Sequence, residues 1–329
     1  MNESTAPLVH VGLHRTGTTW LQRGLFAANG PGFHPALSLD EAIDLLVRPH
    51  PLAWHPDSAR AKAKAGLEAA RAHGRVPVVS CEELSGNPHA GNRTAVATLD
   101  RIAQVLPEAR VLLVLRRQPD LILSNHRQFV ARGGTRSLAA YLSPDPAWFR
   151  MPRLAPEPFE FDRLAARCIE RFGEDRVLFA CHEALVEDPV VFMRRIAEFA
   201  GASITEAALR SLPSERVNAS PSGLRASIQR RTNRWLLRDD VNPDAPFTSW
   251  RFRSLLARLD QRLLRHLSGP IERRDRFRVE AWCRGRFAES NARLAAMTGL
   301  ELRRYGYELP AMAEGAGDGL AAAAPRRAF

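Results

Sequence analysis

Short apolar segments alternate with longer amphipathic segments along most of the chain. Four runs have the length and composition of buried strands, and they are Leu8–Val11, Val76–Ser80, Val111–Leu115 and Val177–Ala180. Between and after them, apolar residues recur at helical spacing in Trp20–Ala28, Ser58–Ala72, Arg93–Leu106, Leu121–Ala131, Phe161–Phe172 and Val190–Ala200. Strands that alternate with helices predict an α/β fold of three layers, in which helices flank a central parallel sheet.

The remaining segments follow neither pattern clearly. Residues 31–57 are rich in Pro and His and are expected to fold over the ligand site, while residues 132–160 and 212–250 are expected to be irregular loops. The segments Ser254–Leu267 and Phe277–Met297 are amphipathic, which predicts a mainly helical part from about residue 250 to residue 310. We expect one domain over residues 1–310. Residues 311–329 are rich in Ala and Gly, which predicts a disordered tail.

Composition narrows the class of protein. The 329 residues suffice for one large domain, and an apolar content of 45% supports a packed core. No apolar run approaches the ~18 residues that cross a membrane, and the N-terminal residues lack the basic and apolar regions of a secretory signal. The four cysteines are far apart and form no Cys-x-x-Cys pair. This pattern indicates reduced, mostly buried thiols in a cytoplasmic protein.

The charge is strongly positive and comes almost entirely from arginine. The formal net charge is +11, and Lys62 and Lys64 are the only lysines. A basic surface attracts nucleic acids, acidic membranes or anionic small ligands. The arginines are scattered and are not interleaved with aromatic residues, so we do not expect a nucleic-acid partner. The histidines show no spacing typical of metal ligands, so we expect no metal.

The loop after the first strand carries the clearest chemistry. Gly12 and Gly17 are separated by four residues, and Thr18, Thr19 and an apolar helix start follow them. Such a loop points backbone N–H groups at one spot, which suits a phosphate or a sulfate. An ATP-binding loop would continue with Lys, but Thr18 has that position and the cation, Arg15, lies inside the loop. The loop therefore indicates an anionic nucleotide other than ordinary ATP.

A second candidate anion site follows the strand Val111–Leu115. Arg116 and Arg117 end this strand, and Ser124 lies about one turn inside the predicted next helix. An arginine fork with a hydroxyl group binds a second phosphate well. The alternative is a solvated strand end whose arginines pair with nearby Asp or Glu. Because no Asp ends an apolar strand to hold magnesium, as it does in ATPases, the two sites suggest a doubly anionic nucleotide bound without a metal.

Together the two motifs resemble those of the sulfotransferase family, which uses 3′-phosphoadenosine 5′-phosphosulfate (PAPS). The family motif Pro-Lys-x-Gly-Thr-[Thr/Ser]-Trp-Leu is matched by residues 14–21. The family motif Arg-x7-Ser is matched by Arg116 and Ser124, and residues 177–201 are similar to a later strand and helix of bacterial members. The likeness covers about residues 7–235. It implies that the 3′-phosphate is held by Arg116 and Ser124, and the 5′-phosphosulfate by Arg15, Thr16, Gly17, Thr18, Thr19 and Trp20.

Two departures from the family pattern bear on activity. The family usually has Lys at the position of Arg15, where the resemblance implies contact with the leaving oxygen. Arginine keeps the positive charge, so we expect activity, and weakened or lost activity is the alternative. The glycine-rich cofactor segment of animal cytosolic members is not recognisable. The segment Arg225–Arg234, which follows Asn218-Ala219-Ser220, is the candidate replacement.

Sulfuryl transfer also needs a base that takes the proton of the acceptor. The resemblance implies a His or a Glu shortly after a core strand, and Val76–Ser80 leads into Glu82 and Glu83. Glu82 has the better position relative to the strand. Adjacent carboxylates point in different directions, so only one serves, and the alternative for both is a helix cap or an arginine partner. His34, in the loop after the first helix, is the third candidate.

The sequence thus predicts a PAPS-dependent sulfotransferase that acts on a hydroxyl or amine group. Its acceptor is a small molecule, a carbohydrate or a lipid, and neither the acceptor nor the oligomeric state can be read from the sequence. Two alternatives are a nucleotide kinase with a degenerate loop and a catalytically inactive nucleotide-binding or nucleic-acid-binding protein. Magnesium-dependent ATP binding favours the kinase. Salt-sensitive nucleic-acid binding, with no sulfated product, favours the inactive protein.

Overall fold

The computed structural model describes residues 5–143, 154–212, 220–239 and 241–311. Within these ranges, five parallel strands form one sheet in the order β2-β3-β1-β4-β5. The strands are β1 Leu8–Val11, β2 Phe33–Pro35, β3 Val76–Cys81, β4 Arg110–Leu115 and β5 Val177–Cys181. Four of them match the strands predicted from the apolar runs. The first strand of the chain is therefore the central strand of the sheet.

Helices make up most of the rest of the described chain. Their bounds are α1 Thr18–Arg23, α2 Leu39–Ala42, α3 Pro56–Ala72, α4 Ala95–Val105, α5 Gln118–Ala131, α6 Leu138–Leu142, α7 Phe161–Phe172, α8 His182–Glu187, α9 Pro189–Ala200, α10 Glu206–Arg210, α11 Gly223–Leu236, α12 Trp250–Leu259, α13 Arg265–Leu267, α14 Gly269–Cys283 and α15 Ala288–Thr298. A 3₁₀ turn, Glu82–Ser85, follows β3, and a π turn, Asp260–Leu264, joins α12 to α13.

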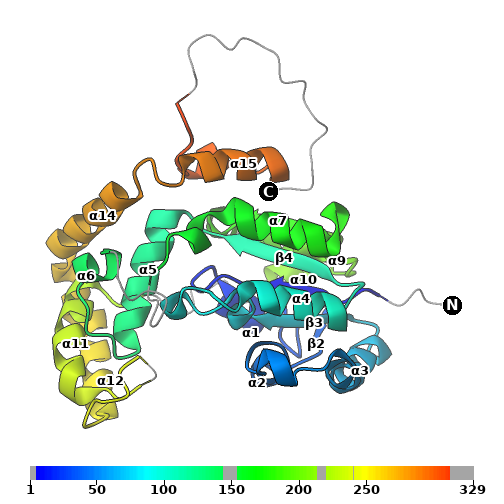
Figure 1. Cartoon of the computed structure of the whole chain (residues 1–329), viewed down its shortest axis with the longest axis horizontal. Coiled ribbons are helices and arrows are strands. Elements are labelled where there is room, and N and C mark those ends of the chain that lie inside the picture. Colours follow the sequence, from blue (N-terminus) through cyan, green and yellow to red (C-terminus); the bar gives the residue numbers. More distant parts are fainter. Residues whose placement is uncertain (1–4, 144–153, 213–219, 240, 312–329) are drawn as a thin grey trace.

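A hydrophobic core lies on each face of the sheet, because successive strand residues point to opposite sides. Val9, Val79 and Leu113 face one core, which α3, α4 and α7 cover. Leu8, Val78 and Leu112 face the other core, which α1, α9 and α10 cover. Both faces of the sheet are thus buried, which explains why the strands are continuously apolar rather than alternating. The predicted three-layer α/β fold is confirmed (Figure 1).

The C-terminal helices extend away from the sheet. In Figure 1, α11, α12 and α14 lie beyond α5 at one end of the molecule, and α15 packs back against α7. The segment Phe277–Met297 is mostly helical, as predicted, but it is divided between two helices, since α14 ends at Cys283 and α15 starts at Ala288. Between them Gly285 has a positive φ of 69° and its N–H group donates to Glu308, which turns the chain. One domain over residues 1–310 stays a prediction.

Three segments differ from the loops that the sequence predicts. Residues 31–57 do not fold over a ligand site, because they contain β2 and α2 and bury Leu45 and Leu46 in a core. Residues 212–250 contain the 14-residue helix α11, which the side chain of Ser222 caps by accepting from the N–H group of Arg225. Residues 132–160 contain α6 and a 3₁₀ turn at 157–159. Residues 144–153, 213–219 and 312–329, and with them Asn218, Ala219 and nearly all of the predicted tail, lie outside the described residues.

One glycine fixes how closely α3 approaches the sheet edge. A Cβ atom built on Gly66 would lie 1.8 Å from the carbonyl oxygen of Ala36, the residue after β2. No side chain fits at that separation. The glycine therefore lets α3 lie directly against the end of β2.

Candidate active site

A cleft of about 580 Å³ opens at the carboxyl ends of the strands. Residues that follow four of the strands line it: Arg15 and its neighbours after β1, Glu82 after β3, Arg116 after β4, and His182 with Glu183 after β5. The central position of β1, with its neighbours wound in opposite directions, creates the crevice in which parallel sheets bind ligands. The fold thus brings both sequence motifs to one opening.

The loop after β1 has a strained, left-handed backbone. Arg15 has a φ of 69° and Gly17 a φ of 91°, which only glycine adopts without cost. The hydroxyl of Thr16 donates to the carbonyl of Leu13 at 2.7 Å, so this side chain is buried and shapes the loop rather than facing the cleft. The Thr18 hydroxyl oxygen is buried and has no hydrogen-bond partner in the described structure. Thr18, Thr19 and Trp20 line the cleft.

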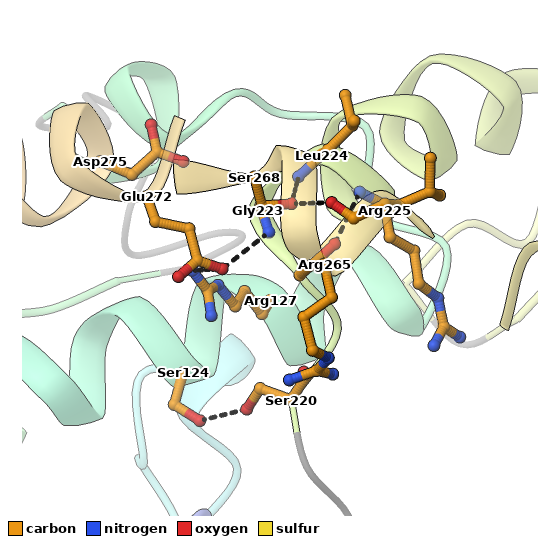
Figure 2. Close-up of polar contacts among 12 residues, drawn as sticks. Ser124, Arg127, Ser220, Gly223, Leu224, Arg225, Arg265, Ser268, Glu272 and Asp275 are labelled. Carbon is orange, nitrogen blue, oxygen red and sulfur yellow. Dashed lines mark hydrogen bonds and ion pairs between the residues drawn. The ribbon is translucent and has the colours of Figure 1, made fainter. Parts of the chain in front are cut away.

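The side chain of Arg15 connects the loop to the second motif. Its Nε donates to Ser124 Oγ at 2.9 Å, and its Nη2 donates to Ser220 Oγ at 2.6 Å. The two serine oxygens are 3.3 Å apart and face each other in Figure 2. Arg116 Nη1 in turn donates to the carbonyl oxygen of Arg15 at 2.8 Å. The two predicted anion sites therefore meet through Arg15.

The two arginines at the end of β4 have different surroundings. Arg117 is the paired arginine of the alternative interpretation, since it lies 2.7 Å from Asp120 and 2.7 Å from Glu280, although it is half-buried rather than solvated. Arg116 makes no ion pair within the described chain. Burial lowers the pKa of Arg116 from its usual value, and burial followed by the neighbouring Arg116 lowers the pKa of Arg15. Two half-buried cations side by side favour the binding of an anion between them.

Glu183 is an acidic residue that lines the same cleft as Arg15 and Arg116. Its carboxylate accepts from the backbone N–H of Arg117 at 3.0 Å and from the hydroxyl of Tyr307 at 3.3 Å. Burial raises the pKa of Glu183, although these hydrogen bonds and the charge of Arg116 oppose the shift. Glu183 lines the cleft, so its charge state changes the electrostatic potential that an anionic ligand meets.

The three candidate bases occupy different places. Glu82 lines the cleft, and its Oε2 is buried without a hydrogen-bond partner among the described residues. The carboxylate of Glu83 lies instead 3.6 Å from Nε2 of His14. His34 lies on β2 beside Pro77, four residues before the end of β3, and stacks on His73 with ring centroids 5.1 Å apart. The structure brings Glu82 to the cleft and does not bring His34 there.

Sequence reasoning missed several residues of the cleft. His182 and Glu183 line the cleft. Their signal in the sequence is that they follow the predicted strand Val177–Ala180, since the carboxyl ends of parallel strands lie at one edge of the sheet. Gln128, one turn after Ser124 on α5, also lines the cleft, and its Oε1 is buried without a hydrogen-bond partner. Leu185, Val186 and Pro189 add apolar side chains to the lining of the cleft.

Two further structural observations concern metals and membranes. No cluster of three or more His, Cys, Asp or Glu side chains within the described ranges is arranged to hold a metal ion. In the same ranges, no helix combines the length and the apolar character that crossing a bilayer requires.

Comparisons with known proteins identify the family. The sequence profile of the sulfotransferase family matches residues 7–206. No curated protein matches the chain. Among solved structures, a sulfotransferase from Alicyclobacillus acidocaldarius is 18% identical, with a TM-score of 0.47, and the match covers 68% of this chain and 89% of that one.

Two other solved structures are similar at a lower level. A sulfotransferase from Mycobacterium avium is 16% identical with a TM-score of 0.37, over 66% of this chain and 71% of that one. A mouse sulfotransferase in complex with PAP is 14% identical with a TM-score of 0.33, over 66% of this chain and 70% of that one. The profile match alone spans well over half of the sequence and includes both anion-binding motifs, so the chain belongs to the sulfotransferase family.

Proposed function

We propose that the protein transfers a sulfuryl group from PAPS to a hydroxyl or amine group of an acceptor. The single observation that carries this proposal is the bond from Arg116 to the backbone of Arg15. It joins the loop after β1 to the end of β4 across one cleft. One adenosine nucleotide with charges at its 3′ and 5′ positions suits that arrangement better than a nucleotide charged at one end.

The residues of the cleft fit the chemistry of PAPS. Arg15, Thr18 and Thr19 would contact the 5′-phosphosulfate, because the Thr18 hydroxyl has no hydrogen-bond partner in the described structure and Arg15 is a half-buried cation. Arg116 and Ser124 would contact the 3′-phosphate, with Ser220 beside them. The indole of Trp20 and the side chains of Leu185 and Val186 offer apolar surfaces to the adenine. A volume of about 580 Å³ leaves room for the nucleotide and part of an acceptor.

In the transfer step, the acceptor oxygen or nitrogen attacks the sulfur atom in line with the leaving group. A new bond forms between the acceptor atom and sulfur, while the bond from sulfur to the 5′-phosphate oxygen breaks and leaves PAP (3′-phosphoadenosine 5′-phosphate). Negative charge grows on that oxygen as the bond breaks. Fixed positive donors around it, here Arg15 and the loop N–H groups, stabilise the transition state.

The acceptor proton goes to Glu82 in this proposal. Its Oε2 is buried and makes no hydrogen bond in the described structure, so it is available to accept a proton inside the cleft. Gln128 lines the same cleft, and its amide group, whose Oε1 has no partner in the described structure, would form a hydrogen bond with a hydroxyl or amine of the acceptor. These groups favour a polar acceptor, such as a small molecule, a carbohydrate or a lipid head group.

The proposal includes a reducing, cytoplasmic setting. Cys81, Cys168, Cys181 and Cys283 are all buried and free. Burial raises the pKa of each of these thiols to about 12, so they are unreactive and need no disulfide partner.

Calorimetry with PAP tests the cofactor assignment without knowledge of the acceptor. We expect tight binding without a metal, much weaker binding of AMP, and a large loss of PAP affinity in Arg116→Ala. The control is Arg117→Ala, which removes the neighbouring arginine that points away from the cleft. Equal affinities for PAP and AMP, or a requirement for ATP and magnesium, would contradict the proposal. Screening of acceptors by mass spectrometry would then identify the product.

A further inference from the structure

A row of leucines lies exposed on the C-terminal helices. Leu255, Leu259, Leu263 and Leu267 follow one another along α12, the π turn and α13, and they are 55%, 41%, 52% and 56% exposed. Scattered exposed leucines are common on protein surfaces, but four at a fixed spacing of four residues form a continuous apolar stripe. This stripe needs a physical explanation.

The π turn keeps the four leucines on one side. In an α-helix, positions four residues apart drift by about 40° around the axis, so a long row at that spacing winds away from a single face. The turn Asp260–Leu264 has the wider π geometry, which holds more residues per turn and reverses the drift. A local irregularity of the backbone thus aligns the leucines into a straight stripe.

The inner side of the same segment holds it to the protein by other contacts. Leu256 is buried, and Asp260 is only 1% exposed. The Asp260 carboxylate accepts from the backbone N–H of Ser222 at 3.2 Å and lies 3.7 Å from Arg225 and 3.6 Å from Arg265. The segment is therefore anchored from its inner side, and the outer leucines are not needed to attach it.

Positive charge flanks the leucine stripe. Arg251, Arg258 and Arg262 are exposed. Arg258 and Arg262 directly precede leucines of the stripe, and Arg251 lies four residues before its first leucine. None of the three makes an ion pair within the described chain, and the only acidic residue between positions 250 and 267 is the buried Asp260. We call these three arginines and the four leucines the leucine–arginine face. The middle of this face is apolar, and the positive charges along its side form no ion pair within the described chain.

Two large aromatic side chains are also exposed near the N-terminal end of α12. Phe247 and Trp250 are each 65% exposed. Tryptophan is enriched where proteins meet the boundary between water and lipid. A helix with leucine along one side, and arginine beside it, has the composition of segments that lie in the plane of a membrane surface.

Charge complementarity selects among the possible occupants of this face. A second copy of the chain, related by a two-fold axis, would bring the same arginines opposite one another with no acidic residue to pair with them. A nucleic acid would match the charge but offers no surface for a stripe of aliphatic side chains, since bases stack on aromatic groups. Anionic lipids match both the charge and the apolar stripe.

We propose that the leucine–arginine face binds the surface of membranes that contain anionic lipids. The leucines enter the boundary of the acyl chains, and Arg251, Arg258 and Arg262 contact the lipid phosphates. The face is also connected to the cleft. Arg265, in the same segment, donates to the carbonyl oxygen of Ser220 at 3.1 Å, and the two residues lie side by side in Figure 2. The hydroxyl of Ser220 accepts from Arg15. Membrane binding therefore places the edge of the cleft close to the lipid surface.

Flotation of the full chain with lipid vesicles tests the proposal. We expect the protein to float with vesicles that contain about 30% phosphatidylglycerol, to bind phosphatidylcholine alone much more weakly, and to dissociate as salt is raised. The double variant Leu259→Gln/Leu263→Gln should bind at least about tenfold more weakly. Leu52→Gln is the matched control, since Leu52 is 89% exposed and distant in sequence from this face. It should bind like the wild type.

A second pair of variants separates charge from apolar contact. Arg258→Gln/Arg262→Gln should weaken binding by about tenfold or more, while the control Arg303→Gln, at an exposed position outside the face, should not. Unchanged melting temperature and PAP affinity show that the variants are folded. The proposal fails if the wild type does not float at low salt, or if the leucine variant binds as tightly as the wild type. It also fails if the wild type self-associates without binding vesicles and the leucine variant abolishes that self-association.

Discussion

The guanidinium of Arg15 donates from Nε to Ser124 Oγ at 2.9 Å, and this bond links the loop after β1 to α5. Arg15 stands where the family usually has Lys, which has no fork of donors with which to contact two serines at once. The substitution therefore changes the architecture of the site and not only the size of one side chain. It also makes Arg15 part of both halves of the proposed nucleotide site.

Replacement of Arg15 should weaken nucleotide binding. We expect Arg15→Ala to raise the Kd for PAP by about tenfold to a hundredfold, since hydrogen bonds to charged groups contribute about 1.5–3 kcal/mol. Arg15→Lys should lose less, because it keeps the charge and gives up only the fork. Calorimetry on the three proteins measures both effects. If Arg15→Ala binds PAP like the wild type, Arg15 does not contact the nucleotide.

The base can be tested by comparing two adjacent carboxylates. Glu82→Gln should lower turnover by about 10² to 10⁴, the usual contribution of a general base, while the Kd for PAP changes little. Glu83→Gln is the control because Glu83 lies beside His14 and does not line the cleft. Turnover is followed as PAP release with an acceptor found by screening. A larger loss in Glu83→Gln than in Glu82→Gln would reverse the assignment.

Glu183 should oppose anion binding while it is ionised. Because Glu183 lines the cleft close to Arg116, we expect Glu183→Gln to tighten PAP binding several-fold. The amide oxygen can still accept from the N–H group of Arg117, and the amide NH₂ group can donate to the hydroxyl oxygen of Tyr307. Burial raises the pKa of Glu183, so the wild type should also bind PAP more tightly as the pH falls through that pKa. The variant should lose this part of the pH dependence. Calorimetry across a pH series measures it, and an identical pH profile in both proteins would exclude the effect.

Three buried histidines and the half-buried His89 should make the fold sensitive to acid. Burial lowers the pKa of His10 and His14 to about 3, and of His89 and His126 to about 4. The unfolded chain binds these protons near pH 6.5, so stability is complete above that value and is lost as the pH falls toward the folded pKa values. Each histidine costs about 1.4 kcal/mol per pH unit in this window. Denaturant titrations at pH 7, 6 and 5 should show the slope, and His126→Gln should reduce it by one histidine.

A single methyl group should destabilise the contact between α3 and the sheet. Gly66→Ala would place its Cβ 1.8 Å from the carbonyl oxygen of Ala36, so the helix has to move. We expect a loss of stability of about 1–3 kcal/mol or more. Gly269→Ala is the control, since its Cβ would meet nothing closer than 3.5 Å at the first position of α14. Equal melting temperatures for the two variants would contradict the close approach.

Local pattern was sufficient for the strands with long apolar runs but not for β2. Phe33–Pro35 is three residues long and lies in a segment rich in Pro and His, so its composition resembles a loop. It becomes a strand because β3 offers an unpaired edge, which only the tertiary structure provides. The same limit applies to the C-terminal helices. The amphipathic pattern of Ser254–Leu267 predicts a helix, but it does not show that Leu255 and Leu259 face outward while Leu256 faces the protein.

The site could be predicted to a similar degree. The loop after β1 and the pair Arg116 and Ser124 carry recognisable spacing, so the sequence indicates them before any coordinates are known. The contact between Arg15 and Ser220 joins residues that are 205 positions apart, and no local pattern contains it. The sequence ranks Glu82 before His34, but the position of His34 on β2, away from the cleft, depends on a strand that the sequence does not predict.

The order of strands in the sheet has a consequence for how the chain emerges during synthesis. β1 is made first, yet both of its neighbours, β3 and β4, follow only after residues 76 and 110. A nascent or truncated chain that stops before Arg110 leaves the apolar central strand with an open edge, which is prone to aggregate. Translation must therefore continue beyond β4 before the emerging chain can pair both edges of its central strand.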